Sequence, residues 1–343
     1  MQRFLNIFFL SFFVLLVGCK NLSITEKNNL CVVSYNVENL FDTEDDSLTI
    51  DEDFTPQGSY HWTPRKLRFK MNQLSKVICN LNEGKSPMLI GLYEVENRNV
   101  LEQFVRQSLL KKWNYQIVHQ ESTDRRGIDV ALLYQPLQFS LISEQFIRVE
   151  KSRDILYAKG MLKNKDTLHV FLVHNKSRRG SAIASESQRM KVMNLVRQRV
   201  DSLFALSTPQ NIIIMGDMND TPMNKSLTES LKALDLSNLE TQINARELYN
   251  LMDSSLKSYG GIGTYKFQQR WDLLDQFIVS GNLLKGKNKT QVIGQRAYIY
   301  SPDYLFVKDN RTGADRLIFR TNSGFSYVGG FSDHLPIYLY LTK

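Results

Sequence analysis

The chain has 343 residues, and its 43 Lys and Arg against 35 Asp and Glu give a formal net charge of +8 at pH 7. Hydrophobic residues make up 42% and charged residues 23%, as in ordinary globular chains, which excludes collagen-like and low-complexity proteins. Three cysteines are too few for a disulfide scaffold. The positive charge favours an anionic partner without naming one.

Residues 1–18 have the layout of a secretory signal. Arg3 gives a positive start, and the apolar run at residues 4–17 is too short to span a membrane. The run ends in LVGC at residues 16–19, and small residues before a Cys resemble the lipobox of bacterial lipoproteins. The resemblance implies that Cys19 becomes the lipid-modified first residue of the mature chain. An ordinary secretory signal with an incidental Cys is the alternative.

This interpretation divides the chain into a lipoprotein signal peptide at residues 1–18, a lipid-anchored tether at residues 19–29 and one domain at residues 30–343. Acyl chains contribute about 0.8 kcal/mol per buried CH₂ to membrane binding, so several chains on Cys19 would anchor the protein firmly. We therefore expect a monomeric, membrane-anchored lipoprotein outside the cytoplasm, in the periplasm or on the cell surface.

Short apolar runs and amphipathic helices alternate along the domain. Thr63 followed by Pro64 is a typical helix start, and apolar residues then recur at spacings of four and three. Ser185 with Gln188 indicates a capping box at the start of another long helix. In chain order, we expect strands at residues 30–35, 88–92, 128–134, 168–173, 211–215, 273–279 and 335–341, and further helices at residues 97–110 and 224–234.

The spacing of these elements bears on how they pack. Helices separate the strands too unevenly for a simple βαβ repeat, so mixed sheets packed together with helices outside fit better. Between residues 239 and 326, only the run at 273–279 is clear, and we expect long surface loops there. Cys31 and Cys79 are expected to be buried free thiols, with a disulfide as the alternative. Asp129 is expected to be a buried acid paired with an Arg rather than a catalytic group.

Acidic, amide and imidazole side chains border nearly every apolar run. Since catalytic groups are commonly held where a rigid scaffold meets loops, we expect these strands to converge on one edge of the sheets. The residues concerned are Asn36, Glu38, Glu94, His174, Asp217, Asn219, Asp275, Asp333 and His334.

The chemistry of this set indicates a divalent metal and a phosphate substrate. Carboxylate and amide oxygens suit Mg²⁺, with Mn²⁺ or Ca²⁺ as alternatives, whereas zinc has little support without a CxxC or HExxH motif. Hydrolases that use Mg²⁺ usually act on phosphates. His174 and His334 can move protons near neutral pH. Arg178 and Arg179, which closely follow His174, are suited to hold phosphate oxygens.

Six segments together resemble the endonuclease/exonuclease/phosphatase family, which includes deoxyribonuclease I, abasic-site endonucleases, neutral sphingomyelinases and inositol phosphatases. The segments are SYNVENLF, GLYEVEN, VHNKS, GDMND, LLDQFIVS and FSDHLP, and the resemblance covers about residues 31–343. It implies an α/β fold, a four-layer α-β-β-α sandwich of two packed mixed sheets with outer helices, with the site at one edge of the sheets.

The resemblance also implies roles for single residues. Asn36 and Glu94 match the positions that hold the metal, and Glu38 matches a position that is acidic in some members and adds a ligand. Asp217 and Asn219 match the pair that positions the attacking water and contacts the phosphate.

The remaining matches concern the histidines. Asp275 matches an Asp that supports a histidine or a metal, and Asp333 and His334 match the Asp-His element near the C-terminus. His174 matches a position that is His in deoxyribonuclease-like members and Tyr in abasic-site enzymes, which favours the former chemistry. The W-x-G-D-x-N-x-R pattern of inositol polyphosphate phosphatases is missing, because Met215 precedes Gly216.

We therefore expect a Mg²⁺-dependent phosphoesterase whose first-choice substrate is a phosphodiester of nucleic acid outside the cytoplasm. A phosphomonoester, or a lipid- or inositol-type phosphodiester near the membrane, is the second choice. A non-catalytic surface-binding lipoprotein is an alternative of another class. Tyr265, Phe267 and Trp271 could stack on a base or sugar, with ordinary strand packing as the equal alternative.

The lipid anchor can be tested directly. Cys19→Ala should prevent lipid attachment and leave the protein unprocessed or mislocalised, because the thiol that carries the acyl chains is gone. The measurement is metabolic labelling with a fatty acid. Equal labelling of the variant and the wild type would show that Cys19 is not the lipidation site.

Overall fold

The computed structural model describes residues 29–178, 182–236, 242–285, 290–308 and 316–343. The predicted signal peptide, Cys19 and nearly all of the tether lie outside this part of the chain, so those assignments stay predictions. Within the described ranges, no helix has the length and apolar character needed to cross a bilayer.

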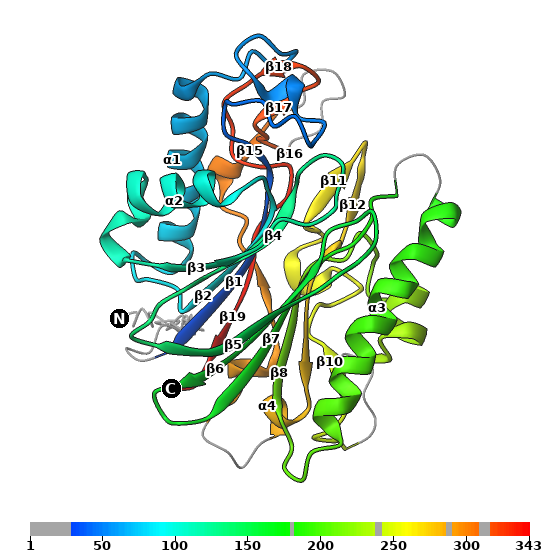
Figure 1. Ribbon diagram of the computed structural model, residues 1–343. Coiled ribbons are helices and arrows are strands. Elements are labelled where there is room, and N and C mark those ends of the chain that lie inside the picture. Colours follow the sequence, from blue (N-terminus) through cyan, green and yellow to red (C-terminus); the bar gives the residue numbers. More distant parts are fainter. Residues whose placement is uncertain (1–28, 179–181, 237–241, 286–289, 309–315) are drawn as a thin grey trace, which may run out of the picture.

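Two mixed sheets pack face to face, with helices on both outer faces (Figure 1). The first sheet has six strands in the order β14-β19-β1-β2-β4-β3, and the second has seven in the order β5-β6-β7-β8-β13-β10-β9. Helices α1 and α2 cover the first sheet and α3 covers the second, which confirms the predicted α-β-β-α sandwich.

The strands of the first sheet are β1 Leu30–Leu40, β2 Leu89–Val95, β3 Gln116–His119, β4 Asp129–Tyr134, β14 Tyr298–Ile299 and β19 Ile337–Leu341. Those of the second are β5 Phe139–Ile147, β6 Ile155–Leu162, β7 Thr167–His174, β8 Asn211–Asp217, β9 Ala233–Asp235, β10 Leu248–Asn250 and β13 Asp275–Ser280. Three two-stranded antiparallel sheets pair β11 Tyr265–Phe267 with β12 Arg270–Asp272, β15 Phe306–Val307 with β16 Leu317–Ile318, and β17 Asn322–Ser323 with β18 Ser326–Tyr327. The helices are α1 Pro64–Leu81, α2 Arg98–Gln107, α3 Ala182–Phe204 and α4 Asn282–Lys285.

Alternation along the strands divides the core into three layers. In β1, Val32 lies in the core between the two sheets, whereas Cys31 and Val33 lie in the core under α1 and α2. In β8, Met215 faces the other sheet and Ile214 packs in the core under α3. Because successive side chains of a strand point to opposite faces, strands buried on both sides are apolar at every position. This explains the short, continuous apolar runs.

The start of α1 is as the sequence predicts. The side-chain oxygen of Thr63 accepts a hydrogen bond from the Lys66 backbone N–H, and Pro64 occupies the first helical position. The predicted apolar face is buried against the first sheet, and Lys70 is buried on that face as well.

Several local expectations are wrong. Ser185 lies inside α3 rather than at its start, and its hydroxyl accepts a hydrogen bond from Arg189, so the predicted capping box does not form. The expected helix at residues 224–234 is a single π-helical turn at Ser226–Ser230 followed by β9. The region 239–326 holds short strands as well as loops. The sequence did not indicate these strands, because most are only two or three residues long and leave no periodic signal.

Two expectations about buried groups have different outcomes. Cys31 and Cys79 are buried free thiols, as predicted. Asp129 is buried, but its ionisable partner is His119 at 3.7 Å rather than an Arg. Arg153 pairs with Asp124, at 3.0 Å.

Candidate active site

Strand register in the second sheet aligns three of the predicted site residues. In the parallel pair β7–β8, His174 is the register partner of Asp217, and in the antiparallel pair β8–β13, Asp275 is the partner of the same residue. Gly216 precedes Asp217 with a φ of +150°, and a Cβ atom there would overlap the Val173 carbonyl oxygen. Only glycine allows β7 and β8 to approach this closely at the site.

The first sheet contributes Asn36 from β1 and Glu94 from the end of β2. The Asn36 Nδ2 donates to Asp217 Oδ2 at 3.1 Å and lies 3.4 Å from Glu94 Oε1. The Asn39 backbone N–H donates to Glu94 Oε2 at 3.0 Å. A single buried amide therefore joins carboxylates that belong to different sheets.

His334, just before β19, lies between two carboxylates. Its Nδ1 is 2.7 Å from Asp275 Oδ2, and its Nε2 is 3.7 Å from Asp217 Oδ2. Burial alone would lower the pKa of His334, but Asp275 and Asp217 raise it well above its ordinary value. The two carboxylates therefore favour the imidazolium form of the ring, and the Tyr265 ring packs against it with 4.9 Å between centroids.

His174 has the opposite electrostatics. Its Nε2 lies 3.6 Å from Asp217 Oδ2 and 3.9 Å from Glu94 Oε1. Burial, with help from Arg153, lowers the pKa of His174 well below its ordinary value. A neutral imidazole can donate a hydrogen bond to a phosphate oxygen but is a poor source of a proton.

Asp217 lies between these two rings and is buried. Burial raises the pKa of Asp217 from 3.8 to about 7, although the neighbouring His334 imidazolium opposes the shift. Its Oδ1 accepts a hydrogen bond from the Asn219 backbone N–H at 2.9 Å. A carboxylate with a pKa near the working pH is well suited to accept a proton from water.

Asn219 and Arg178 form the rim beside Asp217. Asn219 has a left-handed φ of +49°, and its side chain donates to the Asn175 carbonyl at 3.0 Å. The Arg178 Nε donates to the Asn219 carbonyl at 2.7 Å, so this guanidinium supports the turn that carries Asn219. Phosphate binding by Arg178 stays a prediction, and Arg179 lies outside the described residues.

Arg320 bridges two of the acids, Glu38 and Asp333. Glu38 accepts hydrogen bonds from Arg320 Nε at 3.1 Å and from the Thr321 backbone N–H at 2.7 Å. Asp333 accepts from the same guanidinium at 2.8 Å. Asp275 therefore contacts the His334 imidazole, while Asp333 faces Arg320. Glu38 as a metal ligand stays a prediction.

The site's donor set fits a divalent cation. The carboxylates of Asp217 and Asp275 each offer an oxygen ligand, and these atoms lie within 4.8 Å of one another and of a His334 ring nitrogen. Asp275 Oδ1 is buried and accepts no hydrogen bond from the described residues. Such a buried acidic cluster, with Glu94 close by, suggests a site for a hard cation.

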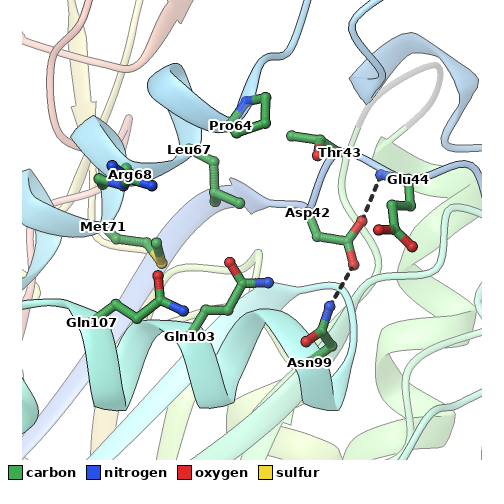
Figure 2. Close-up of a pocket in the computed structure, with 10 residues that line it drawn as sticks. All are labelled: Asp42, Thr43, Glu44, Pro64, Leu67, Arg68, Met71, Asn99, Gln103 and Gln107. Atoms are coloured by element: carbon green, nitrogen blue, oxygen red, sulfur yellow. Dashed lines mark hydrogen bonds between the residues drawn. The ribbon is translucent and has the colours of Figure 1, made fainter.

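Two cavities in the described part of the chain lie outside this cluster. One of about 210 Å³ is enclosed by α1, α2 and the loop after β1 (Figure 2), and its lining includes none of the described site residues. In it, Asp42 accepts hydrogen bonds from the Glu44 backbone N–H and from Asn99. Another, of about 130 Å³, is lined by Arg178 and Asn224 and adjoins the turn that carries Asn219. We assign the site from its chemistry, because a metal and phosphate site can be shallow.

The sequence analysis missed the basic residues that support the site, chiefly Arg320 and Lys70. Lys70 carried a usable signal, since it follows Leu67 by three residues and precedes Leu74 by four, on the apolar face of α1. A lysine at a core position of an amphipathic helix needs a buried partner. Arg320 lies between very short strands, where no sequence pattern indicates which acid it would pair with.

A protein-family model described as the endonuclease/exonuclease/phosphatase family matches residues 31–343. The chain therefore belongs to that family, and it is a phosphoesterase of this type. No curated protein matches the sequence.

Solved structures with the same fold share little sequence with the chain. TDP2 of D. rerio, complexed with a single-strand DNA product, has a TM-score of 0.54 at 13% identity, covering 92% of this chain and 99% of that one. A mannosyl-6-phosphatase of Bacteroides thetaiotaomicron has a TM-score of 0.51 at 14% identity, covering 92% and 100%. At these identities the likeness shows the fold alone.

The raised pKa of Asp217 predicts a pH-dependent effect on stability. The folded protein keeps the Asp217 proton up to about pH 7, whereas the group ordinarily loses it near 3.8. Raising the pH from 5 to 8 therefore destabilises the wild type at this position, while Asn does not titrate. In EDTA, the melting temperature of Asp217→Asn minus that of the wild type should grow by at least about 2 °C over this range.

Thermal melts at pH 5 and pH 8 measure this difference. Glu229→Gln, which removes an exposed carboxylate, is the matched control and should show a constant difference. A difference for Asp217→Asn that stays constant or shrinks as the pH rises would show that the Asp217 pKa is not raised.

Proposed function

We propose that this protein is a Mg²⁺-dependent phosphoesterase and that its substrate is a phosphodiester of nucleic acid. The observation that supports this most strongly is the Asp217 carboxylate, which is contacted from both sheets and lies between a neutral and a protonated imidazole. This arrangement offers a proton acceptor and two hydrogen-bond donors around one point. A binding module has no need of that combination.

In the proposed reaction, water attacks phosphorus in line with the leaving oxygen. Asp217 accepts the proton of that water, and the Asn219 N–H holds the carboxylate in place. The His334 imidazolium, kept charged by Asp275, stabilises negative charge on the phosphate oxygens. His174 donates a hydrogen bond from Nε2 to the phosphate or the leaving oxygen.

Glu94 and Asn36 would hold the cation, with Asp217 and Asp275 close by. When bound, Mg²⁺ neutralises charge that builds on the phosphate. Glu38 would act from one step further away, since its carboxylate is paired with the Arg320 guanidinium, whereas within the described residues Glu94 accepts hydrogen bonds only from an amide and a backbone N–H.

The proposed location is outside the cytoplasm, in the periplasm or on the cell surface, with lipid on Cys19 and residues 19–29 as the tether. Two features of the sequence support this, the LVGC segment at residues 16–19 and the polar character of residues 20–29. A net charge of +8 is compatible with a polyanionic substrate.

Parallel assays of purified full-length protein test the reaction class and the substrate together. With Mg²⁺, plasmid DNA or RNA should be cleaved faster than p-nitrophenyl phosphate. EDTA should abolish the activity and Mg²⁺ or Mn²⁺ should restore it, because the carboxylates at the site would otherwise repel the phosphate. Turnover of p-nitrophenyl phosphate alone would favour a phosphomonoester, and activity that survives in EDTA would contradict the metal dependence.

Two substitutions distinguish catalysis from a contaminating nuclease. Asp217→Asn and His334→Ala should each lower kcat by about 10²- to 10⁴-fold. Since the two groups act on one phosphate, the double variant should be little worse than the poorer single variant. Turnover close to that of the wild type in either single variant would contradict the assignment.

A further inference from the structure

Lys70 is a buried lysine whose ammonium faces the active-site end of β1. Its side chain is on the apolar face of α1 and the residue is 1% exposed. The Nζ donates to the Glu38 carbonyl oxygen at 2.5 Å and to Thr321 Oγ1 at 2.6 Å. Neither acceptor is a carboxylate, so the cation is aimed at a peptide group and a hydroxyl.

The peptide group that Lys70 contacts also contacts Glu94. The Glu38 carbonyl and the Asn39 N–H belong to one planar peptide unit, and that N–H donates to Glu94 Oε2 at 3.0 Å. Fixing the carbonyl therefore fixes the direction of the N–H. Hydrogen bonds in such a chain also polarise one another, so the ammonium strengthens the bond to the carboxylate.

The backbone at this unit is held in an unfavourable conformation. Glu38 and Asn39 both have left-handed φ angles, +53° and +54°. Non-glycine residues adopt this region only where the surroundings enforce it, and such residues cluster at functional sites. Lys70 holds the peptide from one side and Glu94 from the other.

The far side of the same segment is held by Thr321. Its backbone N–H donates to Glu38 Oε2 at 2.7 Å, and its hydroxyl donates to the Phe331 carbonyl at 3.0 Å. Burying an ammonium costs free energy that an apolar residue on this helix face would avoid. Simple packing therefore does not explain a lysine here.

We propose that Lys70 is a positioning residue for the metal site, acting on Glu94 through the single Glu38–Asn39 peptide unit. This inference rests on the proposed metal-dependent function and adds a residue to its machinery. Lys70 touches neither substrate nor metal. It orients the N–H that holds the Glu94 carboxylate, and partners of this kind typically change metal affinity or activity by about 10- to 100-fold when lost.

The test compares Lys70→Met with Thr321→Val in the full-length protein. Lys70→Met keeps most of the length of the side chain and removes the charge, and Thr321→Val removes one of the two acceptors. Binding of Mn²⁺, measured by electron paramagnetic resonance, should weaken at least tenfold in Lys70→Met and less, in the same direction, in Thr321→Val. The Mg²⁺ concentration for half-maximal activity should rise in parallel.

Arg65→Met is the matched control, because it removes an exposed cation from the first turn of the same helix and should bind Mn²⁺ like the wild type. Thermal melts establish that each variant is folded at the assay temperature. A folded Lys70→Met protein with wild-type Mn²⁺ affinity would overturn the inference, since a structural role alone changes only the melting temperature.

Two other outcomes are decisive. If Lys70→Met does not fold, Thr321→Val decides: weaker Mn²⁺ binding supports the inference and unchanged binding overturns it. A wild-type protein that binds no Mn²⁺ would contradict the proposed metal dependence itself, and the role of Lys70 with it. Failure of the inference and failure of the function are thus distinguishable.

Discussion

The hydrogen bond from Asn36 to Asp217 is the interaction on which the rest of the site depends. It crosses from the first sheet to the second and joins two fully buried side chains over 3.1 Å. His174 lies within 4 Å of both carboxylates that this amide contacts, Asp217 and Glu94, and His334 lies within 4 Å of Asp217. A small slip between the sheets would separate these groups, so sheet packing sets the geometry of the chemistry.

Burying so many acids at one edge carries a cost in stability. Burial raises the pKa of Glu38 and of Asp217 to about 7, and nearby cations oppose both shifts. Arg320 bridges Glu38 and Asp333, and Asp275 holds the His334 imidazolium. These pairs hold the carboxylates in place where a bound cation would need them. Natural proteins commonly give up stability at such sites.

Much of the fold could be predicted from sequence because its strands are buried on both faces. The continuous apolar runs, the Thr63–Pro64 helix start and the polar residues at strand ends each have a direct physical cause that leaves a mark in the sequence. The resemblance then supplied the layer order, which periodicity alone could not. The two-stranded sheets between residues 265 and 327 were missed, since strands of two or three residues are too short to show a hydrophobic period.

Prediction from sequence had similar limits within the active site. The sequence does not show which acid contacts His334, because Asp275 matches an Asp that supports a histidine or a metal, and Asp333 directly precedes His334. The β8–β13 register decides it by placing Asp275 beside Asp217, while Arg320 engages Asp333. Pairings of this kind depend on loops far apart in the chain. The same is true of the Glu38–Asn39 peptide, whose importance follows only from its contacts.

We propose that Glu94 and Asn36 hold a cation beside the His334 imidazolium, which is itself no ligand. Anomalous diffraction from crystals soaked in Mn²⁺ would locate the cation. We expect a peak at the Glu94 carboxylate, with the His334–Asp275 hydrogen bond intact. A peak between Asp275 and His334, with that hydrogen bond broken, would make His334 a metal ligand and contradict the proposed site.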